Sequence, residues 1–390
     1  MKKEKPVFLD GASNTPLDKR VLAAMKPYLQ ETFVGNSASP HDCGIKALSA
    51  IINARKQVAE ATGCLFSEVY FTSGATEGNN WAIYSVAREQ LLSGMKRPNI
   101  VCCATEHSSV LNACKSWVDF GFEVSLAYPD KNGRITLESV QDLINDQTCL
   151  VCVMATNNET GITNEVNRIC SLALKHGAYT LVDCTQEMSL GSSFVKICTK
   201  HPFSNFYTFS AHKLYGPTGV GCLITDKHRT LSPMFHGGSQ ENGLRGGTSN
   251  TAGIVGLGRA VELLSNSDFS SKYTELFSYF YDKIKGYGKL NFISDRPNII
   301  SANFAELNLH TSNLAGLLST YGICVSAGSA CDANKSDIDG FNPSHVLAAS
   351  GLSENDIRNT IRISFTKHTT KKDIDRLFSA IENIIMEQKG

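Results

Sequence analysis

Apolar runs and segments of helical periodicity alternate along the chain up to about residue 260. Apolar or β-branched runs indicate buried strands, and they recur at Val69–Thr72, Asn99–Ala104, Glu123–Ala127, Cys149–Ala155, Ala178–Asp183, Phe206–Phe209 and Gly219–Ile224. Helical spacing of apolar residues appears between them at Leu48–Thr62, Glu77–Leu92 and Asn164–His176. This alternation predicts an α/β fold with a doubly wound, mostly parallel sheet.

The pattern changes in the last third of the chain. A long helical stretch at Ser270–Lys285 is followed by the short apolar segments "NIISANF", "GICVSAGSAC" and "TIRISF", and a last helix is predicted near Lys372–Glu387. This succession favours a smaller α+β domain. We therefore expect a large domain over residues 15–261 and a small domain built from residues 1–14 and 262–390.

Composition and charge exclude several classes of function. The chain has 390 residues, 42% of them hydrophobic, and a formal net charge of zero, which gives no electrostatic bias toward nucleic acid. A small neutral or zwitterionic substrate fits this balance better than a polyanion. The sequence has no apolar run of membrane-spanning length and no signal-peptide pattern at its start, so we expect a cytoplasmic protein that does not enter a membrane.

Thirteen cysteines are present, and most are expected to be reduced core residues. Cys149 and Cys152 form a C-x-x-C pair inside a predicted strand, where positions i and i+3 point to opposite faces and cannot share a metal ion. Cys102 and Cys103 also point to opposite faces of a predicted strand, so they cannot share a metal ion either. No metal site is therefore predicted, and Cys331 is left as the one cysteine in an unusual setting.

Polar residues collect just after several predicted strands. The segment "FTSGATEGNN" brings Ala75 and Thr76 to the start of a helix, where backbone N–H groups favour an anion. His107, Asn158, Asp183 and Gln186, and then Ser210, His212 and Lys213, follow later strands. Ligands of open α/β sheets bind at the carboxyl ends of the strands, so these side chains are expected to line one pocket.

The chemistry of this set favours pyridoxal 5'-phosphate. A lysine such as Lys213 can form a Schiff base with a carbonyl cofactor, and Asp183 can keep a pyridine nitrogen protonated so that the ring accepts electrons. His107 can stack on such a ring and Gln186 can contact its hydroxyl group. Phosphate ligands are expected among Ala75, Thr76, Ser210 and His212.

Simpler explanations exist for several of these residues taken singly. His107 is also explained as a histidine at a helix N-terminus, and Asn158 as a turn residue. Arg362 is also explained as a solvated strand residue, and Cys331 as an inert loop thiol. His41 is interpreted as a loop residue without a catalytic role. Asp183 is harder to explain this way, because a buried carboxylate without a cationic partner is disfavoured.

The sequence resembles the cysteine desulfurases, class-V aminotransferase-like members of the fold-type I pyridoxal phosphate enzymes, nearly from end to end. The resemblance rests on segments that occur in the family's order: "LDGASNTP", "FTSGATEGNNWAI", "TEHSSVLNAC", "NNETGI", "VDCTQ", "FSAHKLYGPTGVGCL", "HGGSQENGLRGGTSN", "SAGSAC" and "IRISF". It implies the roles already given for Lys213, Asp183, His107 and Gln186. It also implies that Thr248 reaches the phosphate of a partner subunit, and hence a homodimer.

The resemblance further implies the substrate and the product. Asn158 and Arg362 would hold the carboxylate of L-cysteine, and a guanidinium fork suits that task. L-alanine would leave while Cys331 keeps the sulfur as a persulfide and passes it to an acceptor protein. The polar segment after Cys331 resembles the long-loop branch of the family, which favours protein acceptors. Iron–sulfur cluster assembly, tRNA thiolation and other sulfur pathways remain open.

Three departures from the family pattern qualify the resemblance. Residues Gly11–Asn14 replace the usual Ala-Thr-Thr run beside the substrate pocket, and Asn242 replaces an arginine near the expected subunit boundary. Extra residues follow Cys331, with Asp332, Asp337 and Asp339 among them. Our hypothesis is that this insertion reflects an altered acceptor or forms a partner-specific docking loop. Two alternatives stay open: a selenocysteine lyase or another pyridoxal phosphate lyase or aminotransferase, and a non-catalytic platform subunit of a sulfur-transfer complex.

Overall fold

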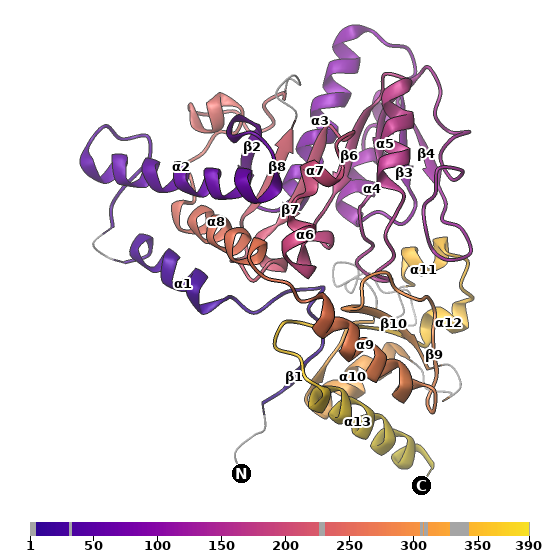
Figure 1. The fold of residues 1–390 in the computed structure, drawn as a ribbon. Helices are drawn as coiled ribbons and strands as arrows, with labels where there is room; N and C mark the ends of the chain where they lie inside the picture. The colour runs from indigo at the N-terminus through magenta and orange to yellow at the C-terminus, as the bar shows by residue number, and fades with distance from the viewer. Residues whose placement is uncertain are drawn as a thin grey trace.

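A seven-stranded mixed sheet forms the larger part of the molecule (Figure 1). The computed structural model describes residues 5–30, 33–225, 231–304, 307, 311–327 and 343–389. In spatial order the strands of this sheet are β2 (Val69–Thr72), β8 (Gly221–Thr225), β7 (Phe206–Ser210), β6 (Tyr179–Asp183), β5 (Thr148–Cys152), β3 (Asn99–Cys103) and β4 (Glu123–Ala127). Only β8 runs antiparallel to its neighbours, so the predicted mostly parallel sheet is confirmed.

The sheet is buried on both faces because helices cover each side. Val101 and Cys103 of β3 pack in the core formed with α2 (Asp42–Thr62), α5 (Val166–Lys175) and α8 (Thr251–Ser265). Ile100 and Cys102 point the other way, into the core under α3 (Ala75–Ser93) and α4 (Ser108–Lys115). Strands covered on both faces carry continuous apolar runs, which explains the pattern in the sequence.

The order of the strands reverses beside β3. The chain goes from β3 outward to β4 at one edge, then returns to the other side of β3 and continues through β5, β6 and β7 toward the opposite edge. Open α/β sheets bind ligands at the carboxyl ends of the strands near such a reversal. The residues that follow β3, β5 and β6 are therefore well placed to share a site.

A second, smaller core lies below the large sheet in Figure 1. It contains an antiparallel sheet in the order β12 (Thr360–Ser364), β10 (Ile299–Asn303) and β9 (Lys289–Leu290). The helices α9 (Ser270–Ile284), α10 (Thr311–Thr320) and α13 (Lys371–Lys389) contribute to this core. The smaller α+β part of the predicted fold is thus confirmed.

The start of the chain belongs to this second core. Strand β1 (Val7–Phe8) pairs in parallel with β11 (Ile323–Cys324), and Val7 and Leu9 are buried among residues of the C-terminal region. This packing is in keeping with a small domain that includes residues 1–14, although the exact boundaries stay a prediction.

The remaining helices of the described chain are short: α1 (Lys19–Met25), α6 (Ser192–Val195), α7 (Ile197–Lys200), α11 (His345–Ala349) and α12 (Glu354–Arg358). The 3-10 turns are η1 (Lys26–Tyr28), η2 (Phe66–Glu68), η3 (Val118–Phe120), η4 (Glu187–Leu190), η5 (Ala211–Lys213) and η6 (Gln240–Gly243).

Capping residues set helix ends that periodicity did not locate. Helix α2 begins at Asp42, six residues before the predicted Leu48, because the His41 ring accepts a hydrogen bond from the Gly44 N–H at 3.3 Å. His41, interpreted as a loop residue, is therefore the N-cap of this helix. At the other end Gly63 adopts a left-handed conformation with φ of 79°, which glycine adopts without strain.

The cysteines of the predicted strands are buried, as expected for core residues. Cys102, Cys103, Cys149 and Cys152 are free and buried. Across the described ranges no cluster of three or more histidine, cysteine or acidic side chains is arranged to hold a metal ion. Within those same ranges no helix is long and apolar enough to cross a membrane.

Candidate active site

A cavity of about 180 Å³ opens at the carboxyl ends of the central strands. It is lined by Ala12, Ser13, Ala75, Thr76, His107, Ser109, Met154, Thr156, Asn158, Asp183, Thr185, Gln186, Ser210, His212, Lys213 and Arg362. The structure therefore brings together every predicted site residue except Thr248 and Cys331. The roles of these residues toward a cofactor and a substrate stay predictions.

Lys213 closes the short turn η5 that follows β7. Its Nζ donates hydrogen bonds to the backbone oxygens of Ala12, at 2.7 Å, and Ser13, at 2.5 Å. Strand β7 is buried along its whole length, so the lysine is carried on a rigid element whose end opens into the cavity. This placement explains why a lysine follows directly after a buried strand.

Asp183 ends strand β6 and is 6% exposed. Asn79 Nδ2 donates to its Oδ2 at 3.0 Å, and the Thr185 N–H donates to its Oδ1 at 2.9 Å. In the part of the chain that the structure describes, no cationic side chain forms an ion pair with it. A buried carboxylate is costly without a positive partner. The Asp183 carboxylate therefore suits a ligand that brings a protonated nitrogen.

His107 and Gln186 flank the same cavity. His107 is the N-cap of α4, and its Nδ1 accepts a hydrogen bond from the Ser109 N–H at 3.1 Å. Because Nδ1 acts as an acceptor, a neutral His107 ring carries its proton on Nε2. His107 is thus both a helix cap and a pocket residue. Gln186 Nε2 donates to the Ala12 oxygen at 2.9 Å, so the N-terminal segment holds its side chain.

The start of helix α3 forms the anion-favouring end of the cavity. The Ala75 N–H donates to Ser210 Oγ at 2.8 Å, which joins the helix start to the end of β7. A Cβ atom on Gly221 would lie 2.5 Å from the Gly74 Cα atom, so β8 approaches this turn as closely as only a glycine allows. Burial, aided by the charge on Lys213, lowers the pKa of His212 to about 4.

Arg362 reaches the cavity from the smaller core. It is 3% exposed. One terminal nitrogen donates a hydrogen bond to the backbone oxygen of Asn158 at 3.1 Å, and the other donates to Asp10 Oδ1 at 2.8 Å. Its Nε is buried and has no hydrogen-bond partner among the described residues. The alternative that Arg362 is a solvated strand residue is therefore wrong. Ile361 and Ile363 pack in the small core, so Arg362 faces the opposite side, which is the cavity.

Comparison with known proteins agrees with this geometry. The family model described as Aminotransferase class-V matches residues 7–377. Cysteine desulfurase IscS of Dictyoglomus turgidum is 34% identical over 390 aligned residues, covering 99% of this chain and 95% of that protein. Cysteine desulfurase IscS of Methanosarcina thermophila is also 34% identical, covering 99% and 93%. This chain belongs to the cysteine desulfurases of the class-V aminotransferase family.

Solved structures of similar proteins confirm the predicted fold. A protein described as NifS-like superposes with a TM-score of 0.86 at 32% identity, covering 98% of this chain and 99% of that one. A second structure, of SspA in complex with cysteine, gives a TM-score of 0.78 at 33% identity, covering 93% of this chain and 99% of that one. The class-V aminotransferase fold is therefore shared over 98% of this chain in the first of these superpositions.

Members of this family use pyridoxal phosphate, and the residues of this cysteine desulfurase fit that group. The Asp183 carboxylate, which forms no ion pair within the described residues, suits a protonated ring nitrogen, and Lys213 suits the cofactor's carbonyl carbon. The α3 N-terminus with Thr76, Ser210 and His212 suits the phosphate.

Two predicted residues lie elsewhere. Thr248 is exposed and lies in a separate surface hollow with Thr72, Ser73 and Arg245, outside the cavity that holds Lys213. Its expected task concerns a partner subunit and stays a prediction. Cys331 and the acidic residues after it lie outside the described residues.

Several residues of the site were not predicted individually. Asp10 and Ser13 contact Arg362, and Asn14 Oδ1 lies 3.2 Å from His212 Nδ1. Thr156 and Asn79 support the walls of the cavity. The segment that departs from the family pattern, Gly11–Asn14, is thus a wall of the site. In the sequence, only the difference of this segment from the family pattern indicated that it borders the site.

Proposed function

We propose that this chain releases the sulfur of L-cysteine, with pyridoxal phosphate as its cofactor, and leaves L-alanine. The observation that carries the proposal is the convergence of Lys213, the buried Asp183 carboxylate and the Arg362 guanidinium on one cavity. The family of the chain supports the choice of substrate, and so does its similarity to SspA, whose structure was solved in complex with cysteine.

Bound pyridoxal phosphate would supply an electron sink for charge that develops on the substrate. Lys213 would hold the cofactor covalently, and Asp183 would keep a proton on its ring nitrogen. His107 would stack on the ring, and Gln186 would contact its hydroxyl group. Thr76, Ser210 and His212 would bind the phosphate at the N-terminus of α3, where the helix dipole favours a negative charge.

Arg362 and Asn158 would select the substrate by its carboxylate. The Arg362 Nε is buried without a partner, and a carboxylate oxygen would satisfy it, which makes substrate binding favourable at this position. Asp10 and Ser13 hold the guanidinium from the other side, so its orientation is fixed before the substrate arrives.

Cys331 would carry the sulfur. The carbon–sulfur bond of L-cysteine breaks and a sulfur–sulfur bond forms on Cys331, so that L-alanine and an enzyme persulfide are the products. A thiol of an acceptor protein then takes the outer sulfur. We further propose a homodimer in the cytoplasm, with iron–sulfur cluster assembly, tRNA thiolation and other sulfur pathways as the possible destinations.

The test is alanine and sulfide release from L-cysteine in the presence of a reductant. Lys213→Ala is expected to abolish both products and the visible-edge absorption of the loaded enzyme. Cys331→Ala is expected to abolish the products but to keep the absorption. Cys43→Ala changes a partly buried thiol at the start of α2, outside the cavity, and serves as the matched control that keeps full activity.

Two results would favour the alternatives. Full turnover by Cys331→Ala would indicate another pyridoxal phosphate lyase or aminotransferase, because such a reaction does not need that thiol. A wild-type chain that neither absorbs as a loaded enzyme nor releases alanine would indicate a non-catalytic platform subunit.

A further inference from the structure

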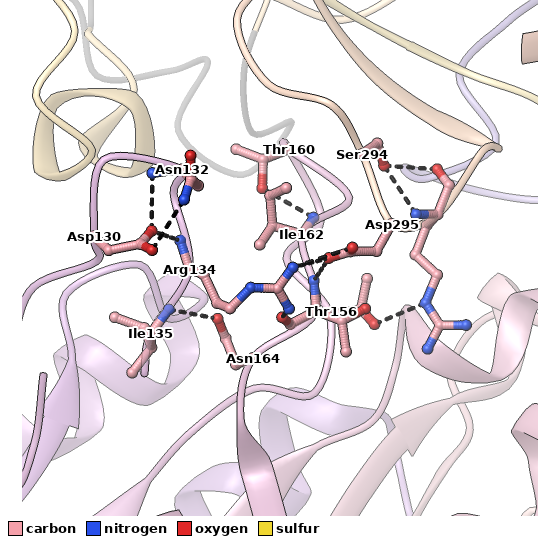
Figure 2. Close-up of polar contacts among 12 residues, drawn as sticks. Asp130, Asn132, Arg134, Ile135, Thr156, Thr160, Ile162, Asn164, Ser294 and Asp295 are labelled. Carbon is pink, nitrogen blue, oxygen red and sulfur yellow. Dashed lines mark hydrogen bonds and ion pairs between the residues drawn. The ribbon is translucent and has the colours of Figure 1, made fainter. Parts of the chain in front are cut away.

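The segment Ser294–Arg296, between β9 and β10, docks against the loop that follows β5 and carries Asn158. Asp295 accepts a hydrogen bond from the Thr163 N–H at 2.8 Å and pairs with Arg134 at 2.9 Å. Figure 2 shows Asp295 and Arg134 pointing toward each other above Asn164. A Cβ atom on Gly161 would lie 2.0 Å from Ser294 Oγ, so the two segments are in close contact.

Arg296 extends from this segment to two walls of the cavity. It is 3% exposed. Its Nε donates to Thr156 Oγ1 at 3.2 Å, and a terminal nitrogen donates to Glu187 Oε1 at 3.1 Å. Thr156 lines the cavity itself, and Glu187 directly follows the pocket residue Gln186. One guanidinium therefore joins the wall after β5 to the wall after β6.

Glu187 is held firmly enough to serve as the fixed end of this bridge. It is fully buried, and its carboxylate contacts His201 Nε2 at 2.7 Å and Lys200 Nζ. Burial alone would raise the pKa of Glu187, but the hydrogen bond from His201 and the positive charges of Lys200 and Arg296 hold it at about 2. The carboxylate is thus charged at neutral pH, and the charge of Arg296 is compensated.

We propose that Arg296 is a positioning residue, which sets the distance between the pocket walls that carry Asn158 and Gln186. Arg296 packs its guanidinium on the Phe194 ring at 4.1 Å, which fixes the plane of the fork. A lysine carries the same charge but does not hold two acceptors in one fixed plane. The assignment of Asn158 to substrate and of Gln186 to cofactor rests on the proposed function.

The experiment compares Arg296→Lys and Thr156→Val with the wild-type holoenzyme. Arg296→Lys keeps the charge beside Glu187 but loses the fork, and Thr156→Val removes only the acceptor hydroxyl group. Each is expected to raise the KM for L-cysteine roughly tenfold, the loss typical of one charge-assisted hydrogen bond, with kcat changed less than about threefold. Amide hydrogen exchange in residues 157–163 should accelerate in both variants.

Arg259→Lys is the matched control, because its ion pair with Glu262 lies within helix α8, away from the cavity. It should leave KM and amide exchange unchanged. The proposal is overturned if both test variants keep the wild-type KM and the wild-type exchange, or if they lower only thermal stability. If the wild type releases no alanine, the proposed function fails, and the exchange rates alone decide whether the bridge holds the loop.

Discussion

At the scale of single residues, the cavity holds two buried charged groups that the described residues satisfy only in part. Asp183 accepts two neutral hydrogen bonds, and Arg362 keeps a buried Nε without a partner among the described residues. Each arrangement is unfavourable in the chain by itself, because burial penalises a carboxylate without a positive partner and a donor without an acceptor. Both costs are offset when a ligand brings a positive ring nitrogen to one and a carboxylate to the other.

His212 gives a prediction about pH. Burial and the Lys213 charge lower its pKa from 6.5 to about 4 in the chain without a cofactor. A histidine with a lowered pKa in the folded state binds its proton more readily when unfolded, so stability is lost as the pH falls from about 6.5 to 4. The free energy of unfolding should drop on the order of 1 kcal/mol over this range because of His212, after allowance for solvent screening.

The measurement is urea unfolding of the cofactor-free chain between pH 4 and pH 7. His212→Gln should flatten the pH dependence, and His176→Gln, at an exposed position, should not. If the free energy of unfolding of His212→Gln depends on pH as steeply as that of the wild type, the expected pKa of His212 is contradicted. Added inorganic phosphate should reduce the slope in the wild type, because a bound anion raises the pKa of a neighbouring imidazole.

The sequence predicted which residue types meet in the site, but not how they are held. Lys213, Asp183 and His107 follow strands, and the rule for carboxyl ends of strands places them together. The contacts of Lys213 with Ala12 and of Arg296 with Thr156 join segments far apart in the chain. No periodicity records such contacts, because they arise only when the two cores pack. Arg362 is buried for the same reason.

At the scale of elements, the strands were predictable and the helix ends were less so. The runs Val69–Thr72 and Glu123–Ala127 match β2 and β4. Apolar runs mark buried strands directly, whereas a helix end depends on one capping side chain. The early start of α2 at His41 shows this, since imidazole is not among the usual N-cap groups.

The approach of β8 to the start of α3 gives a prediction for these elements. Gly221→Ala would place a methyl group 2.5 Å from Gly74 Cα, which is backbone and cannot rotate away. Moving the turn should cost about 1–3 kcal/mol of unfolding free energy. It should also weaken cofactor retention if this turn is the phosphate site that we propose. Chemical denaturation and dialysis of the loaded enzyme measure the two effects.

Gly316→Ala is the matched control for this change. Gly316 lies in helix α10 with open space around its Cα, and alanine there should be neutral or slightly stabilising. If both variants have the same unfolding free energy and the same cofactor retention, the contact between Gly221 and Gly74 does not constrain the turn.

At the scale of the whole molecule, the two cores share the site. Arg362 comes from the small core and Asp183 from the large sheet, and residues at the N-terminus contact both. The alternation in the sequence predicted the class of the sheet. Neither the strand order nor the antiparallel direction of β8 could be predicted, because both depend on how the elements pack against one another.

Assembly gives a further prediction at this scale. If Thr248 completes the phosphate site of a partner subunit, cofactor retention should weaken as the protein is diluted below its dimer dissociation constant. Thr248→Ala should weaken retention at high concentration without changing the sedimentation of the dimer. Thr320→Ala, an exposed threonine in α10, is the control. Fully loaded, active monomers would contradict this expectation.

The contacts between the N-terminal segment and strand β12 also affect when the site can form during synthesis of the chain. The Ala12 N–H donates to Ser364 Oγ at 2.9 Å, and Asp10 pairs with Arg362, so the wall that holds Lys213 rests on residues near the C-terminus. A ribosome makes residues 10–12 long before residues 362–364. The strands of the large sheet can form early, but the site closes only once the last strand has emerged. A chain that still lacks strand β12 is therefore expected to have an incomplete wall beside Lys213.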